Sequence, residues 1–184
     1  MAWTTPATFT TGNVLTAAQM NTNVRDNTGF LHSPPGCLAQ RTTNQSIGAG
    51  SLTGVGFNAT DIYDTDTMHD PVGSSSLITF NTAGVYLVSA TVQFAPSATG
   101  LRRMALYQGA GSEFASAYDG APSAAVNSSL VASFQNLFAA GSNVQCGVLQ
   151  SSGGTLNITT SGLTSFTGQA PVIQFGAQWI SDGT

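Results

Sequence analysis

The sequence predicts an all-β head domain preceded by an extended segment and one short α-helix. After Gly36 the chain consists of short runs rich in Val, Ile, Thr, Phe and Tyr, separated by Gly, Asn, Pro and Ser, which is typical of β-sandwiches. Residues 84–94 and 172–180 alternate apolar and polar side chains with the two-residue period of a half-buried strand. The stretch before Ser33-Pro34-Pro35-Gly36 lacks this texture, and the proline pair predicts a stiff linker. We therefore expect an N-terminal segment over 1–35 and a head domain over 36–184.

The N-terminal segment begins with an extended Thr/Pro stretch and continues into a helix. Thr16 can cap this helix, which we expect to run to about Phe30 with Ala17, Met20 and Val24 on one face. A helix this short is marginal alone in water, so its apolar side must pack on its own head or on another protein or sister subunit. The candidate partner anchor comprises Trp3, Phe9, Leu15, Met20, Val24, Phe30 and Leu31.

About ten strands are expected in the head, and Gly- and Ser-rich pieces separate them. The predicted strands are 37–42, 53–57, 62–63, 77–80, 84–94, 101–108, 127–137, 143–150, 156–160 and 171–180. The alternation within these strands assigns six side chains to the core: Tyr86, Val88, Val92, Phe94, Phe175 and Trp179. Residues 109–125 are expected to form a loop.

The charge content limits the possible partners. Charged residues make up only 7% of the chain, there is no lysine, and the formal net charge is -4. A surface this poor in charge suits a protein that packs among copies of itself or on a large partner. Nucleic acid would be repelled, no apolar run is long enough for a membrane helix, and the N-terminus has no basic-then-apolar secretory signal.

Few residues could carry chemistry, and we expect neither an enzyme nor a cofactor. The densest acidic stretch contains Asp61, Asp64, Asp66 and Asp70, which could supply hard oxygen ligands to calcium. The stretch lacks the glycine and final glutamate of an EF-hand, so a loop with local Asx-turn bonds is the favoured interpretation.

The loop expected over 109–125 offers a second candidate site. Glu113 and Asp119 could form the carboxylate pair of a glycosidase, although two lone acids in a Gly/Ala stretch are more often surface groups. Phe114 and Tyr118 could contact a receptor or glycan, since loops often carry binding residues. Cys37 and Cys146 are expected to be small buried apolar residues, with a disulfide as the alternative.

Residues 76–90, Ser-Leu-Ile-Thr-Phe-Asn-Thr-Ala-Gly-Val-Tyr-Leu-Val-Ser-Ala, carry a family resemblance. They resemble the central signature of C1q/TNF-like domains, in which a Gly-hydrophobic-Tyr turn feeds a core strand of a jelly roll. The lead-in from Phe57 to Tyr63-Asp64, the stretch 137–144 and the ending 175–180 agree with it, although Ser142-Asn143 replaces the usual Asp. The resemblance covers about residues 37–181 and implies a jelly-roll sandwich that forms a homotrimer.

The N-terminal segment resembles the leaders of tailed-bacteriophage structural proteins. The similarity lies in Trp3, Thr5-Pro6, Gly12, Leu15-Thr16-Ala17-Ala18, Asn21, Val24-Arg25-Asp26-Asn27, Phe30 and Leu31. Together the two resemblances imply a trimeric knob made in the host cytoplasm and attached by its leader to the major capsid protein or another virion protein. Capsid decoration is the favoured role, and a tail-associated receptor- or glycan-binding module is the alternative.

Overall fold

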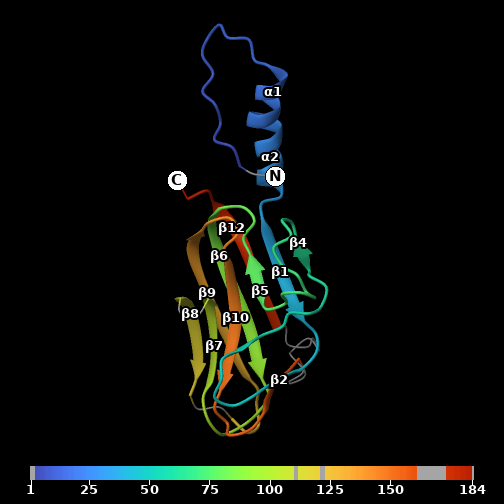
Figure 1. Cartoon of the computed structure of the whole chain (residues 1–184), viewed down its shortest axis with the longest axis vertical. Coiled ribbons are helices and arrows are strands. Elements are labelled where there is room, and N and C mark those ends of the chain that lie inside the picture. The colour runs from blue at the N-terminus through green and yellow to red at the C-terminus, as the bar shows by residue number, and fades with distance from the viewer. Residues whose placement is uncertain (1–2, 110–111, 121–122, 161–172, 184) are drawn as a thin grey trace.

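The protein consists of a two-sheet β-sandwich and a helical leader that projects from one end along the long axis (Figure 1). The computed structural model describes residues 3–109, 112–120, 123–160 and 173–183. The described residues form twelve strands. The head is therefore all-β, as the sequence predicts.

The leader is one continuous helical run with a π-helical centre. It comprises α1 (Ala17–Met20), η1 (Asn21–Asp26) and α2 (Asn27–His32). Thr16 caps its start as expected, because the Thr16 hydroxyl accepts a bond from Gln19 N–H while the Gln19 side chain accepts one from Thr16 N–H. The run ends at His32, and Ser33 is its C-cap immediately before the two prolines.

The strands form a larger seven-stranded sheet and a smaller five-stranded sheet. The larger sheet contains β1 (Gly36–Arg41), β2 (Gln45–Ile47), β4 (Tyr63–Asp64), β6 (Gly84–Phe94), β9 (Ser128–Phe138), β11 (Leu156–Ile158) and β12 (Ile173–Ser181). The smaller sheet contains β3 (Thr53–Gly54), β5 (Leu77–Thr79), β7 (Arg102–Gln108), β8 (Ser112–Asp119) and β10 (Asn143–Gln150).

Strand β6 is the centre of the larger sheet. It pairs with β9 along one side and with β12 along the other, both antiparallel. Its even-numbered side chains, Tyr86, Val88, Ala90, Val92 and Phe94, are all buried, which confirms the predicted strand phase. Phe175 of β12 is buried as well, whereas Trp179 is only half-buried and packs at the leader end of the core.

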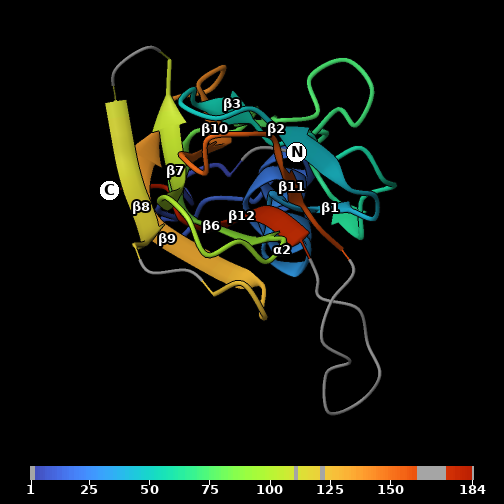
Figure 2. The same ribbon diagram turned by 90° about the horizontal axis from the view of Figure 1, so that it is seen from below.

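Aromatic rings close the sandwich at its β8/β9 edge, where the two strands lie side by side in Figure 2. Phe114 of β8 stacks on Phe134 of β9 with ring centroids 4.7 Å apart. Phe138 continues the cluster to Phe80 at 4.0 Å, and Phe80 packs on Tyr86 at 4.6 Å. Side chains therefore seal this edge of the sandwich.

Two strands depart from the sequence expectation. Residues 112–119, predicted to lie in a loop, form β8, and 45–47 form β2, which was not predicted. β8 contains four Ser and Ala residues and is largely exposed, so its sequence has little strand propensity. It forms a strand because the tertiary fold places it beside β7, with which it pairs. The segment predicted at 53–57 is regular only over β3, and Pro171 and Val172 of the last predicted strand lie outside the described residues.

Gly84 is required by its surroundings. Its φ is 153°, and a Cβ at this position would lie 2.6 Å from the Ser181 carbonyl oxygen and would also overlap the Trp179 indole. The glycine of the family signature thus lets the start of β6 approach the end of β12.

Two buried polar side chains organise loops at the end of the sandwich opposite the leader. Arg102 donates to the carbonyl oxygens of Ser97, Thr99 and Leu101. Gln150 donates to Ile47 O and Gly154 O and accepts from Ser152 N–H at 2.7 Å. These contacts replace much of the water that the two side chains lose on burial, although Arg102 Nε is buried without a partner.

Tyr86→Ala should lower the free energy of unfolding by about 3–5 kcal/mol, because it removes a fully buried ring and the bond from its hydroxyl to Thr82 O. Tyr118→Ala is the matched control. The Tyr118 ring is 56% exposed and lies beside the Arg103 guanidinium, so its loss should cost less than about 1 kcal/mol. Equal losses for the two variants in chemical denaturation would show that the strand phase is wrong.

Candidate partner-binding surfaces

A ladder of three aromatic rings fastens the leader to the head. The Phe30 ring packs edge-on against Trp179 of β12, with centroids 4.8 Å apart, and Trp3 packs on Phe30 at 6.1 Å. Phe30 is almost completely buried as a result. The leader therefore has its own apolar attachment to the head, which the covalent linker supplements.

Two asparagines hold the extended N-terminal stretch against the helix. The buried Asn27 side chain accepts a bond from Thr4 N–H at 3.1 Å and donates to Thr4 O at 2.7 Å. Asn23 accepts from Ala7 N–H at 2.6 Å. These amides satisfy backbone groups much as a neighbouring strand would, so the leader is a folded hairpin of strand-like chain and helix (Figure 1).

The linker between leader and head is also held. Thr65, in the loop after β4, donates its hydroxyl to Pro34 O at 2.8 Å, and Gly36 N–H donates to the same hydroxyl at 2.9 Å. A cavity of about 250 Å³ lies at this junction, lined by Gly29, Phe30, Ser33, Pro35, Thr65 and Asp66.

The predicted anchor residues divide into two groups. Phe30 and Trp3 pack toward the head of their own chain, as described above. The other five are exposed: Phe9, Leu15, Met20, Val24 and Leu31. The sequence left open whether the leader packs on its own head or on another protein, and the structure shows that different side chains are available for each. We call the five exposed residues the leader stripe, and they are accessible to a partner.

A second candidate surface is the outward face of the larger sheet. Cross-strand register places on this face Gly36, Leu38, Gln40, Tyr63, Val85, Leu87, Ser89, Thr91, Gln93, Ser129, Val131, Ser133, Gln135, Leu137, Gln174, Gly176 and Gln178. None of these residues is charged. Val131 is 63% exposed and Leu137 is 58% exposed.

This surface is called here the neutral face. Leu38, Tyr63, Leu87 and Gly176 line a shallow depression of about 90 Å³ in it. Sequence reasoning missed the neutral face, because the outward residues of 84–94 are mostly polar and only their lack of charge sets them apart. The register that adds Val131 and Leu137 to them comes from the tertiary fold.

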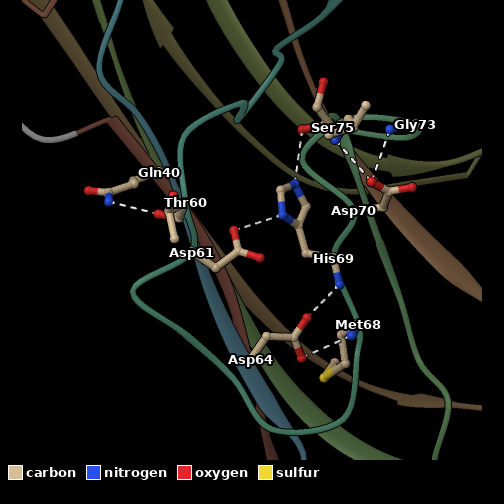
Figure 3. Close-up of polar contacts among 10 residues, drawn as sticks. Gln40, Thr60, Asp61, Asp64, Met68, His69, Asp70, Gly73 and Ser75 are labelled. Carbon is tan, nitrogen blue, oxygen red and sulfur yellow. Dashed lines mark hydrogen bonds and ion pairs between the residues drawn. The ribbon is translucent and has the colours of Figure 1, made fainter.

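Two aspartates of the acidic loop, Asp64 and Asp70, bind backbone groups of their own loop (Figure 3). The Asp64 carboxylate accepts from the N–H groups of Asp66, Met68 and His69. Asp70 accepts from Val72 and Gly73 N–H, and these bonds lower the pKa of its carboxyl. In the described ranges no three His, Cys, Asp or Glu side chains are placed to hold a metal ion. The contacts are those of the Asx-turn interpretation.

The predicted receptor or glycan loop is instead strand β8, which separates its four candidate residues. Phe114 points into the sandwich, where it packs on the core aromatics, and Asp119 pairs in register with the buried Arg102. Glu113 and Tyr118 lie on the outer side, each in contact with Arg103. The two acids therefore do not face one another as a catalytic pair.

Cys37 and Cys146 are both buried free thiols, as the favoured interpretation predicts. Burial raises the pKa of Cys37 to about 12 and raises the pKa of Cys146 as well, so both thiols stay protonated. None of the helices in the described part of the chain has the length and apolar content that crossing a membrane requires.

The sequence matches no protein-family model and no curated protein. The structure is similar to solved structures that share its architecture. Murine APRIL at pH 8.0 aligns with a TM-score of 0.55 and 12% identity over 79% of this chain and 98% of that one. Eiger TNF from S. frugiperda aligns with a TM-score of 0.55 and 12% identity over 82% of this chain and 96% of that one.

The PRD1 vertex protein P5 aligns with a TM-score of 0.53 and 16% identity over 80% of this chain and 97% of that one. At such identities the likeness concerns the fold. The head is a C1q/TNF-like jelly roll. The resemblance found in residues 76–90 is confirmed, and these residues form β5, the turn at Gly84 and the first part of β6.

Phe30→Ala should release the leader from the jelly roll, because it removes about 2 kcal/mol of apolar burial between Trp3 and Trp179. Trypsin cleavage at the exposed Arg25 should then become at least roughly tenfold faster. Leu31→Ala is the control, since Leu31 is adjacent in the helix but exposed. An unchanged rate for Phe30→Ala would mean that the aromatic ladder does not hold the leader.

Proposed function

We propose that the protein is a structural protein of a phage virion, a homotrimeric knob on the particle surface that its leader attaches to the major capsid protein or another virion protein. The single observation that carries the proposal is the division of the leader. One part is fastened to the jelly roll by aromatic packing, and the other part, the leader stripe, is left exposed. The likeness of the head to PRD1 vertex protein P5, a phage protein, supports a place on a virion.

Self-association is supported by the neutral face. This face exposes Leu87, Val131 and Leu137 and has no charged side chains. Another copy of the chain can therefore cover it without burying an unpaired charge. We assign this face to contacts between copies, which leaves the leader stripe for the virion partner.

Capsid decoration is the favoured role, and it needs no catalysis. In the described residues the head is a single two-sheet sandwich, a shape that suits a knob on a shell better than a fibre. Each trimer would add buried area between neighbouring capsid subunits and so resist internal pressure. No enzymatic activity is part of this proposal.

The second candidate is a tail-associated receptor- or glycan-binding module. It is favoured by one cluster on the outer side of the smaller sheet, where Arg103 pairs with Glu113 and lies over the exposed Tyr118 ring at 5.4 Å. An aromatic ring beside charged hydrogen-bonding groups is a surface that sugars can contact.

The double variant Met20→Glu/Val24→Glu should abolish binding to purified empty capsids, because it places two charges in the leader stripe. Sedimentation of the full chain with empty capsids measures the binding. Thr28→Glu, which adds a charge on the same helix at an exposed polar site, should bind like the wild type. Full binding by the double variant would contradict attachment through the leader, and wild-type protein that ignores capsids but binds host cells would favour the second candidate.

Val131→Glu should convert the trimer to monomers in light scattering, because the new carboxylate would be desolvated between copies. Val72→Glu is the control, since Val72 is 93% exposed in a loop and does not belong to the neutral face. A monomeric wild type would refute the trimer, and a trimeric Val131→Glu variant would place the contact on another face.

A further inference from the structure

His69 is a buried histidine with an oxygen at each ring nitrogen. Its side chain is 0% exposed. Nδ1 lies 2.8 Å from Asp61 Oδ1, and Nε2 lies 3.2 Å from the Ser75 carbonyl oxygen (Figure 3). Asp61 lies just before β4, and Ser75 lies in the loop that connects β4 to β5. The ring therefore joins the chain before β4 to the end of this loop.

The proton count of this arrangement is unusual. A neutral imidazole has one N–H, whereas an ionised carboxylate and a carbonyl oxygen can only accept. With His69 neutral and Asp61 ionised, one of the two nitrogen–oxygen pairs would have no proton between its atoms. Both contacts become hydrogen bonds only when the pair holds one more proton, on the imidazole or on the carboxyl.

The charged groups around the ring favour that extra proton. Asp61 faces Nδ1, Asp64 accepts from the His69 backbone N–H, and Asp70 is the next residue. Burial raises the pKa of Asp61 even though His69 acts to lower it. Cys37 of β1 faces Asp61 and Asp64 but is a neutral thiol.

The same loop holds the leader linker. Thr65 bonds to Pro34 and Gly36, and Asp66 accepts from the Thr82 hydroxyl at 2.9 Å and lines the junction cavity. His69 also forms an isolated bridge with Ile78. Asp64 accepts from both His69 N–H and Asp66 N–H, so bonded residues connect His69 with the base of the leader.

We propose that the His69–Asp61 pair is a proton-binding site that clamps residues 61–76, and with them the leader linker, in mildly acidic solution. Loss of the proton loosens the loop. The folded chain holds the proton between two acceptors that the unfolded chain does not bring together, so folding takes up a proton and stability falls as the pH rises. The inference concerns the isolated chain and stands independently of the virion proposal.

Asp61→Asn provides a sharp test. The side-chain amide that this substitution introduces can donate to a neutral Nδ1 while Nε2–H donates to Ser75 O, so both contacts survive without an extra proton. Between about pH 5 and about pH 8 the wild-type melting temperature should fall by about 2–4 °C more than that of Asp61→Asn. The melting temperature of His69→Gln should show the same reduced pH dependence as that of Asp61→Asn. His32→Gln, which removes the exposed histidine of the leader, should keep the wild-type pH dependence.

Nitrogen-15 spectra of the imidazoles report directly on the protonation of each ring nitrogen. The chain has only two histidines, so the signals that disappear in His69→Gln are those of His69. At about pH 5.5 we expect protons on both His69 nitrogens, or one on Nε2 with a proton on the Asp61 carboxyl seen by carbon-13. A ring with an unprotonated nitrogen beside an ionised Asp61 at that pH would overturn the proposal, as would an unchanged pH slope in Asp61→Asn.

Discussion

Strand β6 has to bury one row of side chains completely while the other row faces outward, and much of the molecule depends on this constraint. The buried row supplies Tyr86, Val88, Val92 and Phe94 to a core that both sheets share. The outward row lies in register with β9 on one side and β12 on the other, and it forms the centre of the neutral face. A slip of one residue would exchange the two rows, so the pairing that builds the core also fixes the surface we assign to contacts between copies.

The leader depends on the same sheet. Its aromatic ladder ends on Trp179 of β12, and that indole is in place because Gly84 allows the start of β6 to come close. The short helix gains from this contact the support that its own length does not provide. Fastening Phe30 to the head keeps the leader stripe in a defined direction beyond the end of the sandwich (Figure 1). An anchor presented in this way loses less conformational freedom when it binds than a free tail would.

Buried polar groups complete the two ends of the sandwich. Arg102 and Gln150 fix the loops at the end away from the leader. Burial lowers the pKa of the Arg102 guanidinium, and its bonds to loop carbonyls compensate part of the cost. His69 has the corresponding position in the loop beside the leader, where the proposed proton site joins it to Asp61 and Ser75. One end is therefore held at all pH values near neutrality, and the other end is the one we expect to respond to pH.

The sequence by itself determined the all-β class, the phase of β6, the helix start at Thr16 and the jelly-roll resemblance, because each rests on local periodicity, capping or a contiguous motif. It did not determine β8, whose Ser- and Ala-rich residues become a strand only beside β7, nor the inward and outward separation of Phe114 and Tyr118. The division of the leader residues, the neutral face and the burial of His69 were also decided by the tertiary structure. Each of these depends on contacts between residues far apart in the chain, and a local pattern carries no information about which distant side chains will meet.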